Sequence, residues 1–239
     1  MMRWIRHRRT RPQHSPAALR DAWQCVSLLL EYPGEDFAER VDAVDRALSD
    51  VPARVAEALR EFLVGIDGVS LRDLRAEYVD TFDVTRKCCL HLTYYTHGDT
   101  RRRGVALIEI KQAYRHAGVQ LDDSDAELPD FLPVLLEFGA FADPEGAWKL
   151  LNDYRVGIEL LRLALQRRNS RWLPVITALR VTLPELNGDD QEVLAELIAA
   201  GPPSEDVGLD TSPYSIHPRL NPKPEPYDLG STIPVGAPR

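Results

Sequence analysis

The sequence has few cysteines and no long hydrophobic run, and each absence restricts the class of protein. Three cysteines occur in 239 residues, at positions 25, 88 and 89, and no CxxC pair is among them. An odd number of cysteines without a framework pattern predicts free thiols and a reducing compartment, so we expect a cytoplasmic protein. No apolar stretch approaches the ~20 residues that a membrane-spanning helix needs. We therefore expect a soluble protein without direct membrane insertion.

The sequence also lacks the short motifs of the common enzyme classes. It contains no glycine-rich phosphate loop, no nucleophile elbow and no HExxH zinc motif. At 239 residues with 44% hydrophobic side chains, the chain is long enough to bury a core without disulfides. We predict a folded protein that is not an enzyme and that holds no cofactor.

Charge is distributed unevenly along the chain. Residues 1–16 contain five arginines and no acid, whereas residues 17–200 contain 32 acids and 21 lysines and arginines, a balance of 21 − 32 = −11. An acidic body repels nucleic acid and favours basic or amphipathic peptide partners. We therefore predict a peptide or protein partner and no nucleic-acid partner.

The two ends differ in composition from the region between them. Half of the 18 prolines follow residue 200, in a stretch without apolar periodicity. No apolar core of a signal peptide follows the arginines of residues 1–16. We predict a basic disordered arm over residues 1–16 and a proline-rich disordered tail over residues 201–239. Weak docking of the arm to membrane or nucleic acid remains an alternative for that segment.

Between the tails, apolar residues recur at helical spacing nearly throughout. The fold class that this predicts is all-α, a single multi-helix, bundle-like domain over residues 17–200. The predicted helices cover residues 19–30, 55–66, 71–82, 107–117, 132–142, 148–165, 170–183 and 189–199. Ser70 is expected to cap the third of them and Asp130 the fifth, whereas residues 92–95 form a strand-like piece too short to seed a sheet.

Four residues have the chemistry of metal ligands and lie close together in the sequence: Cys88, Cys89, His91 and His97. Adjacent cysteines do not form the loop of two or more residues that wraps a tetrahedral zinc ion. We therefore predict packed or idle thiols and no metal.

The segment from Tyr94 to Gly104 contains three successive arginines, Arg101 to Arg103, at the start of a predicted helix. Positive charge in a first turn opposes the helix dipole, so we expect these arginines to pair with nearby acids. Asp80, Asp83 and Asp99 are the candidates. A ligand-facing role is the alternative, because two guanidinium groups can bind a diphosphate.

Residues 128–138 form a second unusual segment, because its helix is apolar all round. Such a helix is typical of a central core. The alternative is the wall of a groove that binds an amphipathic helix, where apolar floor residues and an acidic rim are required.

Four segments, residues 28–33, 78–83, 92–104 and 128–138, together resemble the NarJ family of assembly chaperones for the molybdenum cofactor of respiratory nitrate reductase. The resemblance covers about residues 17–200 and leaves out both tails. Related chaperones of trimethylamine oxide and dimethyl sulfoxide reductases have a proline-acid-histidine pattern where this chain has residues 129–131, which favours the nitrate reductase branch. The resemblance implies an all-helical domain that binds an immature catalytic subunit.

The partner that the resemblance implies is the apo catalytic (alpha) subunit of respiratory nitrate reductase, bound at its N-terminal segment. The alternative function is a nucleotide or pterin-dinucleotide binding module that uses the Arg101 to Arg103 turn. The residues expected to bind the client peptide come from the segments that carry the resemblance. They are Tyr78, Phe82, Asp83, Tyr94, His97, Asp99, Arg101, Arg103, Asp130, Leu132, Leu135 and Glu137.

Overall fold

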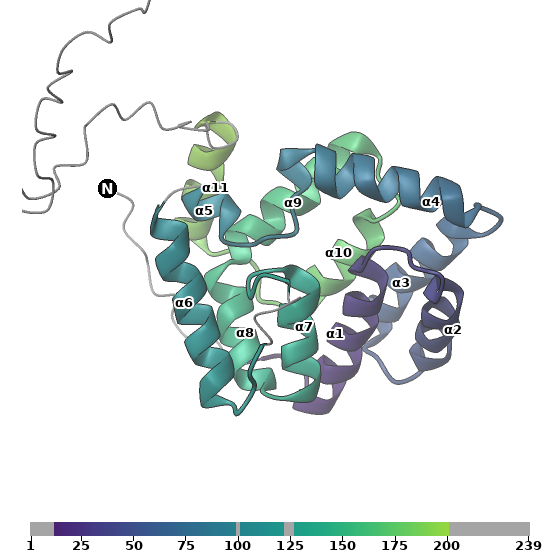
Figure 1. Cartoon of the computed structure of the whole chain (residues 1–239), viewed down its shortest axis with the longest axis horizontal. Helices are drawn as coiled ribbons and strands as arrows, with labels where there is room; N and C mark the ends of the chain where they lie inside the picture. The colour runs from purple at the N-terminus through teal and green to yellow at the C-terminus, as the bar shows by residue number, and fades with distance from the viewer. Residues whose placement is uncertain (1–11, 99–100, 122–126, 201–239) are drawn as a thin grey trace, which may run out of the picture. The chain divides into compact units, whose positions relative to one another are not determined.

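A computed structural model describes residues 12–98, 101–121 and 127–200 of the chain, and the statements below concern these residues (Figure 1). The chain divides into a unit of residues 1–205 and a second unit of residues 206–239, which lies outside the described ranges. The predicted arm falls mostly outside them and the predicted tail entirely. Both therefore stay predictions.

The described residues are helical, which confirms the all-α class. The α-helices are α1 (Pro16–Leu30), α2 (Phe37–Ala47), α3 (Ala53–Ile66), α4 (Leu71–Tyr78), α5 (Tyr94–His97), α6 (Arg101–His116), α7 (Leu132–Phe141), α8 (Pro144–Asp153), α9 (Arg155–Arg168), α10 (Leu173–Val181) and α11 (Gly188–Ala200). A π-helical segment, Val79–Val84, continues α4, and a 3-10 turn, Arg86–Cys88, follows it. An isolated antiparallel bridge joins His91 to Phe131.

Three sequence-based expectations differ from the observed elements. The helix predicted over residues 148–165 is two helices, α8 and α9, with a break at Tyr154. The strand-like residues 92–95 lead into the single helical turn of α5. Helix α2 was not predicted, because its buried residues Phe37, Arg40 and Val44 have helical spacing but an arginine at the middle position.

The core forms around α1, which packs on α2, α7 and α10 (Figure 1). Trp23 of α1 and Trp172, next to α10, are fully buried. The indole nitrogen of Trp23 donates to Thr182 Oγ1 over 2.9 Å, which joins two parts of the chain that lie 159 positions apart in the sequence. Large buried aromatic side chains of this kind contribute most of the apolar area removed from water.

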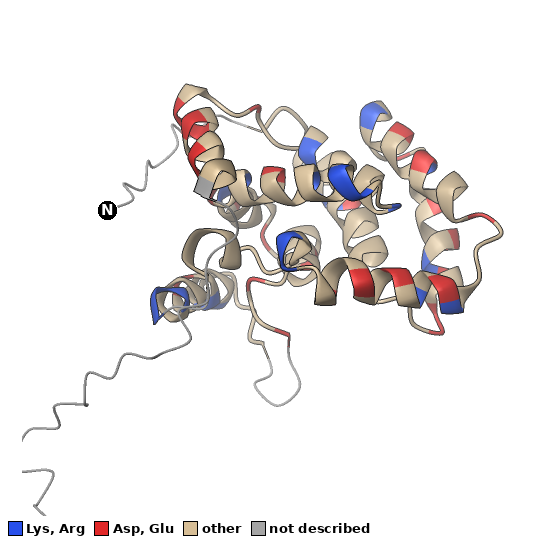
Figure 2. Cartoon of the chain, turned by 90° about the horizontal axis from the view of Figure 1, so that it is seen from above, with Lys and Arg blue, Asp and Glu red and all other residues tan. Residues whose placement is uncertain are grey.

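Charged residues are distributed over many of the helices, with acidic and basic positions interspersed along the ribbon (Figure 2). Among the described residues, no helix is both long enough and apolar enough to cross a membrane.

Helix α7 approaches the core closely at a glycine. A Cβ atom placed on Gly139 would lie 2.6 Å from Ala147 Cβ and 2.7 Å from Cε3 of Trp23. Such distances are shorter than carbon atoms tolerate, so residue 139 has no room for a side chain.

We predict that Gly139→Ala lowers the free energy of unfolding by about 1 to 3 kcal/mol, because the added methyl group overpacks this contact. Gly104→Ala is the matched control, since a Cβ atom at Gly104 of α6 meets nothing within 4 Å. Alanine favours a helix interior over glycine, so the control is expected to be neutral or stabilising by up to ~1 kcal/mol. Urea unfolding of both variants measures the difference, and equal effects would contradict the close packing.

Candidate functional site

A cavity of about 580 Å³ opens where the end of α1, the end of α4 with its π-helical extension, and the start of α7 meet. We call this cavity the groove. Its apolar lining consists of Tyr32, Tyr78, Phe82, Leu90, Phe131, Pro133 and Val134. Its charged and polar lining consists of Glu31, Asp36, Arg40, Asp83, His91 and Glu127, besides Gly34. The groove therefore combines an apolar floor with a rim of four acids.

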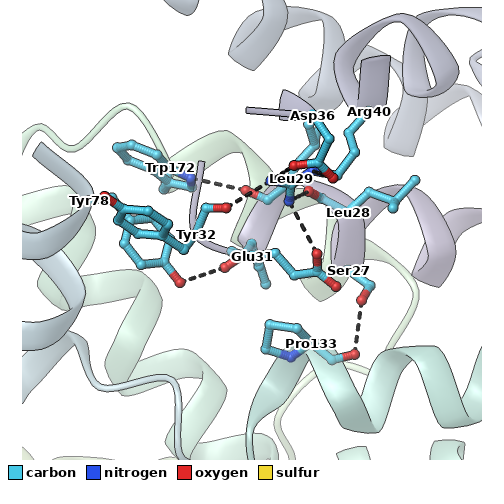
Figure 3. Close-up of polar contacts among 11 residues, drawn as sticks. Ser27, Leu28, Leu29, Glu31, Tyr32, Asp36, Arg40, Tyr78, Pro133 and Trp172 are labelled. Carbon is cyan, nitrogen blue, oxygen red and sulfur yellow. Dashed lines mark hydrogen bonds and ion pairs between the residues drawn. The ribbon is translucent and has the colours of Figure 1, made fainter. Parts of the chain in front are cut away.

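The end of α1 positions one wall of the groove. The carbonyls of a helix's last turn have no partner within the helix, and leaving them buried and unpaired is costly. Here three of these carbonyls each accept a hydrogen bond from a side chain of another part of the chain (Figure 3). Leu28 O accepts from Arg40 Nη1 (3.0 Å), Leu29 O from Trp172 Nε1 (3.1 Å), and Leu30 O from the Tyr78 hydroxyl (2.8 Å).

Arg40 connects this helix end to the acidic rim. Its side chain is buried, donates to the carbonyl of Tyr32 over 2.7 Å, and pairs with Glu31 (3.2 Å) and Asp36 (3.1 Å). Placing a guanidinium group at a helix C-terminus also complements the helix dipole. Arg40 thereby holds Glu31 and Tyr32 at the mouth of the groove.

Glu31 remains in an acidic environment in spite of Arg40. Burial raises the pKa of its carboxyl, Arg40 opposes that shift, and the like charges of Glu137 and Asp36 add to it, so the pKa lies above its ordinary value. A carboxylate in this position is stabilised by an additional positive charge.

Aromatic side chains form the floor beneath the rim. The ring of Tyr78 lies 4.8 Å from that of Phe82 and 5.6 Å from Trp172, measured between centroids. The π-helical turn after α4 places Phe82 in the interior and Asp83 on the surface. Such turns often occur at functional sites.

Asp130 positions the opposite wall. Its side chain has 0% exposure, and its carboxylate contacts His91 Nδ1 (3.2 Å), the Thr93 amide (3.2 Å), the Thr93 hydroxyl and Arg103 Nη2 (3.6 Å). Its carbonyl accepts from the amide of Leu92 over 3.0 Å. The residue therefore fastens the segment before α5 to the segment before α7.

The environment of Asp130 favours its charged form. Burial alone raises the pKa of the carboxyl, but hydrogen bonds from His91 and Thr93 and the positive charges of His91 and Arg103 outweigh that effect. The pKa of Asp130 therefore lies below its ordinary value.

The structure brings only part of the predicted site together in the groove. Tyr78, Phe82 and Asp83 line it, and Glu137 is exposed on α7 near Glu31. Leu132 and Leu135 are fully buried in the core. An alanine at Leu135 would therefore act on stability.

One expectation for Asp130 is wrong. It was expected to cap α7, but the residue that precedes this helix is Phe131, which makes no side-chain cap. Its expected contact with the client peptide stays a prediction, and in the free protein its side chain is buried and its carboxylate is occupied by the contacts described above.

The segment from Tyr94 to Arg103 lies apart from the groove lining. Tyr94 is buried, His97 is half-buried, and Asp99 lies outside the described residues. Arg103 pairs with Asp130, an acid that was not among those expected for the arginine turn. Arg101 is exposed at the start of α6.

The nucleotide-binding alternative loses one of its arginines in this arrangement. With Arg103 directed to Asp130, the exposed Arg101 and Arg102 remain, and successive helical residues diverge by ~100°. Asp80, another expected partner of the turn, pairs with Arg168.

Metal-ligand chemistry is limited in the part of the chain that the structure describes. Within residues 12–98, 101–121 and 127–200, no cluster of three or more histidine, cysteine, aspartate or glutamate side chains could hold a metal ion. Cys88 is buried, which raises the pKa of its thiol to about 11, and Cys89 Sγ accepts from the amide of His91.

Several groove residues were not predicted from the sequence. Glu31 and Tyr32 lie in the segment 28–33 and Phe131 and Val134 in the segment 128–138, so the resemblance covered all four without assigning them to the site. No pattern in the sequence pointed to Glu127 as a groove residue. The clue available was that an acid and a tyrosine, residues 31 and 32, directly follow three leucines at the end of an apolar helix.

The chain is similar to proteins of a known family. A family model described as nitrate reductase delta subunit matches residues 48–178, more than half of the chain. The nitrate reductase molybdenum cofactor assembly chaperone NarJ of Escherichia coli K12 is 34% identical over 194 residues, which cover 80% of this chain and 78% of the relative.

Two further relatives extend the comparison. The nitrate reductase-like protein NarX of Mycobacterium tuberculosis is 38% identical over 143 residues, 60% of this chain, and the chain spans about a fifth of its length (21%). A crystal structure from Archaeoglobus fulgidus, of a protein assigned to redox enzyme maturation, superposes with a TM-score of 0.51 over 73% of this chain and 97% of that one. At 21% identity, the latter supports the fold.

We predict that Asp130→Asn lowers the free energy of unfolding by about 2 to 3 kcal/mol, because it removes a buried charge on which three side chains converge. Asp42→Asn, the same change at an exposed position of α2, is the matched control and should stay within ~0.5 kcal/mol. Chemical unfolding at neutral pH measures both.

The same pair of variants has a predicted pH dependence. Folding lowers the pKa of Asp130 from its ordinary value of 3.8, so its carboxylate stabilises the fold above that pH. That contribution is lost as the pH falls through the lower folded value. The difference between wild type and Asp130→Asn should be constant above about pH 5 and shrink below it. A difference that grows on acidification would contradict the assignment.

Proposed function

Because the chain belongs to the nitrate reductase delta subunit family, which includes the NarJ assembly chaperones, we propose that it binds the immature catalytic subunit of respiratory nitrate reductase. In this proposal it engages the N-terminal segment of that subunit and keeps the subunit competent for insertion of the molybdenum cofactor before membrane assembly. It acts in the cytoplasm, catalyses no reaction and holds no cofactor. The observation that carries the proposal is the groove, with its apolar floor and acidic rim.

The shape and chemistry of the groove suit an amphipathic helix. Its floor presents Tyr32, Phe131 and Val134, which are only partly buried in the free protein. Burying a large apolar side chain of the client against such a floor contributes ~1.5 to 3 kcal/mol. A few anchors at helical spacing therefore suffice for micromolar or tighter affinity.

The acidic rim sets the orientation of a bound client segment more than it sets the affinity for that segment. Glu31, Asp36, Asp83 and Glu127 face the groove, while the positive charge of Arg40 is shared by Glu31 and Asp36. Unpaired rim carboxylates attract a segment with lysine or arginine on its polar face and accelerate its association. A client segment with apolar residues on one face and basic residues on the other fits both features.

Binding of this kind assists assembly through a difference in affinity. A chaperone shifts its client toward a state only as far as it prefers that state over the alternatives. Occupying the N-terminal segment of the unfinished subunit keeps that segment from docking prematurely, and the complex dissociates when the finished subunit folds the segment into its own structure.

The direct test is affinity purification of the full-length chain from cells that express the nitrate reductase catalytic subunit, with and without molybdenum cofactor synthesis. We expect more catalytic subunit to co-purify when cofactor synthesis is blocked. Equal recovery of the cofactor-loaded and cofactor-free subunit would contradict a chaperone of the immature state.

We predict that Val134→Ser weakens binding of a synthetic peptide of the client's N-terminal segment by about fivefold, since it removes ~1 kcal/mol of apolar contact in the groove. Val64→Ser makes the same change on α3, where the side chain is 77% exposed and outside the groove lining, and should leave affinity unchanged. Calorimetric titration compares the two. Equal affinities would place the peptide elsewhere.

The acidic rim leads to a separate prediction. The double variant Asp83→Asn with Glu127→Gln should bind the same peptide more weakly at low salt, and the deficit should disappear near ~1 M salt, where exposed charges are screened. Asp67→Asn with Glu61→Gln neutralises two exposed acids, one on α3 and one directly after it, and serves as the control. A deficit that persists at high salt would mean that the substitutions damage the groove itself.

A further inference from the structure

The groove has more negative charge than its own residues neutralise. Of its four acids, Glu31 and Asp36 share Arg40, whereas Asp83 and Glu127 face the opening as exposed carboxylates. His91, the remaining basic residue of the lining, bonds to the buried Asp130. A basic segment with apolar side chains is therefore complementary to the groove.

Such a segment exists in the chain itself. The residues before α1 read MMRWIRHRRTR and contain five arginines and no acid. Trp4 and Ile5 lie together between Arg3 and Arg6, so two large apolar side chains are flanked by positive charge. This combination of apolar anchors and basic residues is the one that the groove favours.

Helices α1 and α7 set the distance between this arm and the groove. They run antiparallel, because Arg20 Nη1 donates to Ala140 O (3.0 Å) at one end and Ser27 Oγ donates to Pro133 O (2.9 Å) at the other. The groove lies at the second end. From Ser15, which caps α1, to Glu31 the helix rises ~24 Å, at 1.5 Å per residue. An extended chain from Ser15 back to Trp4 spans up to ~36 Å, so Trp4 can reach the groove.

The surface between the two ends is suited to the same segment. Val134, Glu137 and Phe141 recur at i, i+3 and i+7 and so share one face of α7. Val134 lines the groove, Glu137 is exposed, and Phe141, next to the N-terminal end of α1, is 68% exposed. An exposed phenylalanine and an exposed acid therefore lie on the face of α7 between the N-terminal end of α1 and the groove.

We propose that the N-terminal arm, residues 1–11, folds back along α7 and occupies the groove of its own chain when no client is bound, with Trp4 and Ile5 on the apolar floor and the arginines on the acidic rim. The proposal rests on the proposed function, because it makes the arm an internal competitor of the client segment. A tethered segment has a high effective concentration even when its intrinsic affinity is low. Weak cationic peptides are then excluded, and a client must outcompete the arm.

Photocrosslinking locates the arm directly. The full-length protein carries p-benzoylphenylalanine in place of Trp4 and is irradiated without client, and the crosslinked peptides are identified by mass spectrometry. We expect crosslinks within one chain to groove residues such as Tyr32, Phe131 and Val134. Crosslinks to other surfaces, to a second copy of the chain, or to no residue would overturn the proposal.

Affinity measurements test the competition. Replacing the five arginines of the arm with glutamine in the full-length protein should raise affinity for the client peptide about fivefold or more, because the competitor is released. Replacing the same five residues with lysine retains the charge and should leave affinity near that of the wild type. An unchanged affinity in the glutamine variant would contradict the inference.

The two proposals can fail separately. Crosslinks from position 4 to the groove in a protein that binds no client peptide would support the arm's position and overturn the proposed client. Client binding that is sensitive to Val134→Ser but indifferent to the arm would retain the proposed function and overturn the competition.

Discussion

The capping of the last turn of α1 is the interaction on which the rest of the structure depends. The three carbonyls of Leu28, Leu29 and Leu30 lie at the buried or half-buried end of α1, where an unpaired buried carbonyl costs about 1 to 3 kcal/mol. Their donors come from α2, from the residue before α10 and from α4. A single helix end therefore positions three other helices, and the residues that follow it form one wall of the groove.

The acidic side chains have two different roles, which burial distinguishes. Asp130 is fully buried, and its partners from three positions of the chain stabilise its charge, so it connects segments of the fold. Asp83 and Glu127 are exposed at the groove and remain available to a basic partner. Acidic side chains are thus structural where they are buried and suited to recognition where they are exposed at the groove.

Local patterns allowed much of the fold to be predicted, and their failures have physical causes. Helix α3 follows its apolar spacing closely, and Ser70 caps α4 as expected, with its hydroxyl accepting from the amide of Asp73. The break at Tyr154 could not be predicted from the apolar spacing, because α8 and α9 bury the same apolar stripe on either side of it. Helix α2 could not be predicted from the apolar spacing either, because its central buried residue is Arg40, whose burial depends on partners from another helix.

The sequence by itself determined the all-helical class and the acidic body, because periodicity and composition are local properties, and the family resemblance marked three of the segments that line the groove. Only the tertiary structure decided which residues of those segments face the groove. Asp83 and Asp130 cannot be distinguished by residue type, yet one is exposed at the rim and the other is buried beside Thr93, 37 positions away in sequence. Burial and partners arise from contacts between distant parts of the chain, and these are fixed when the chain folds.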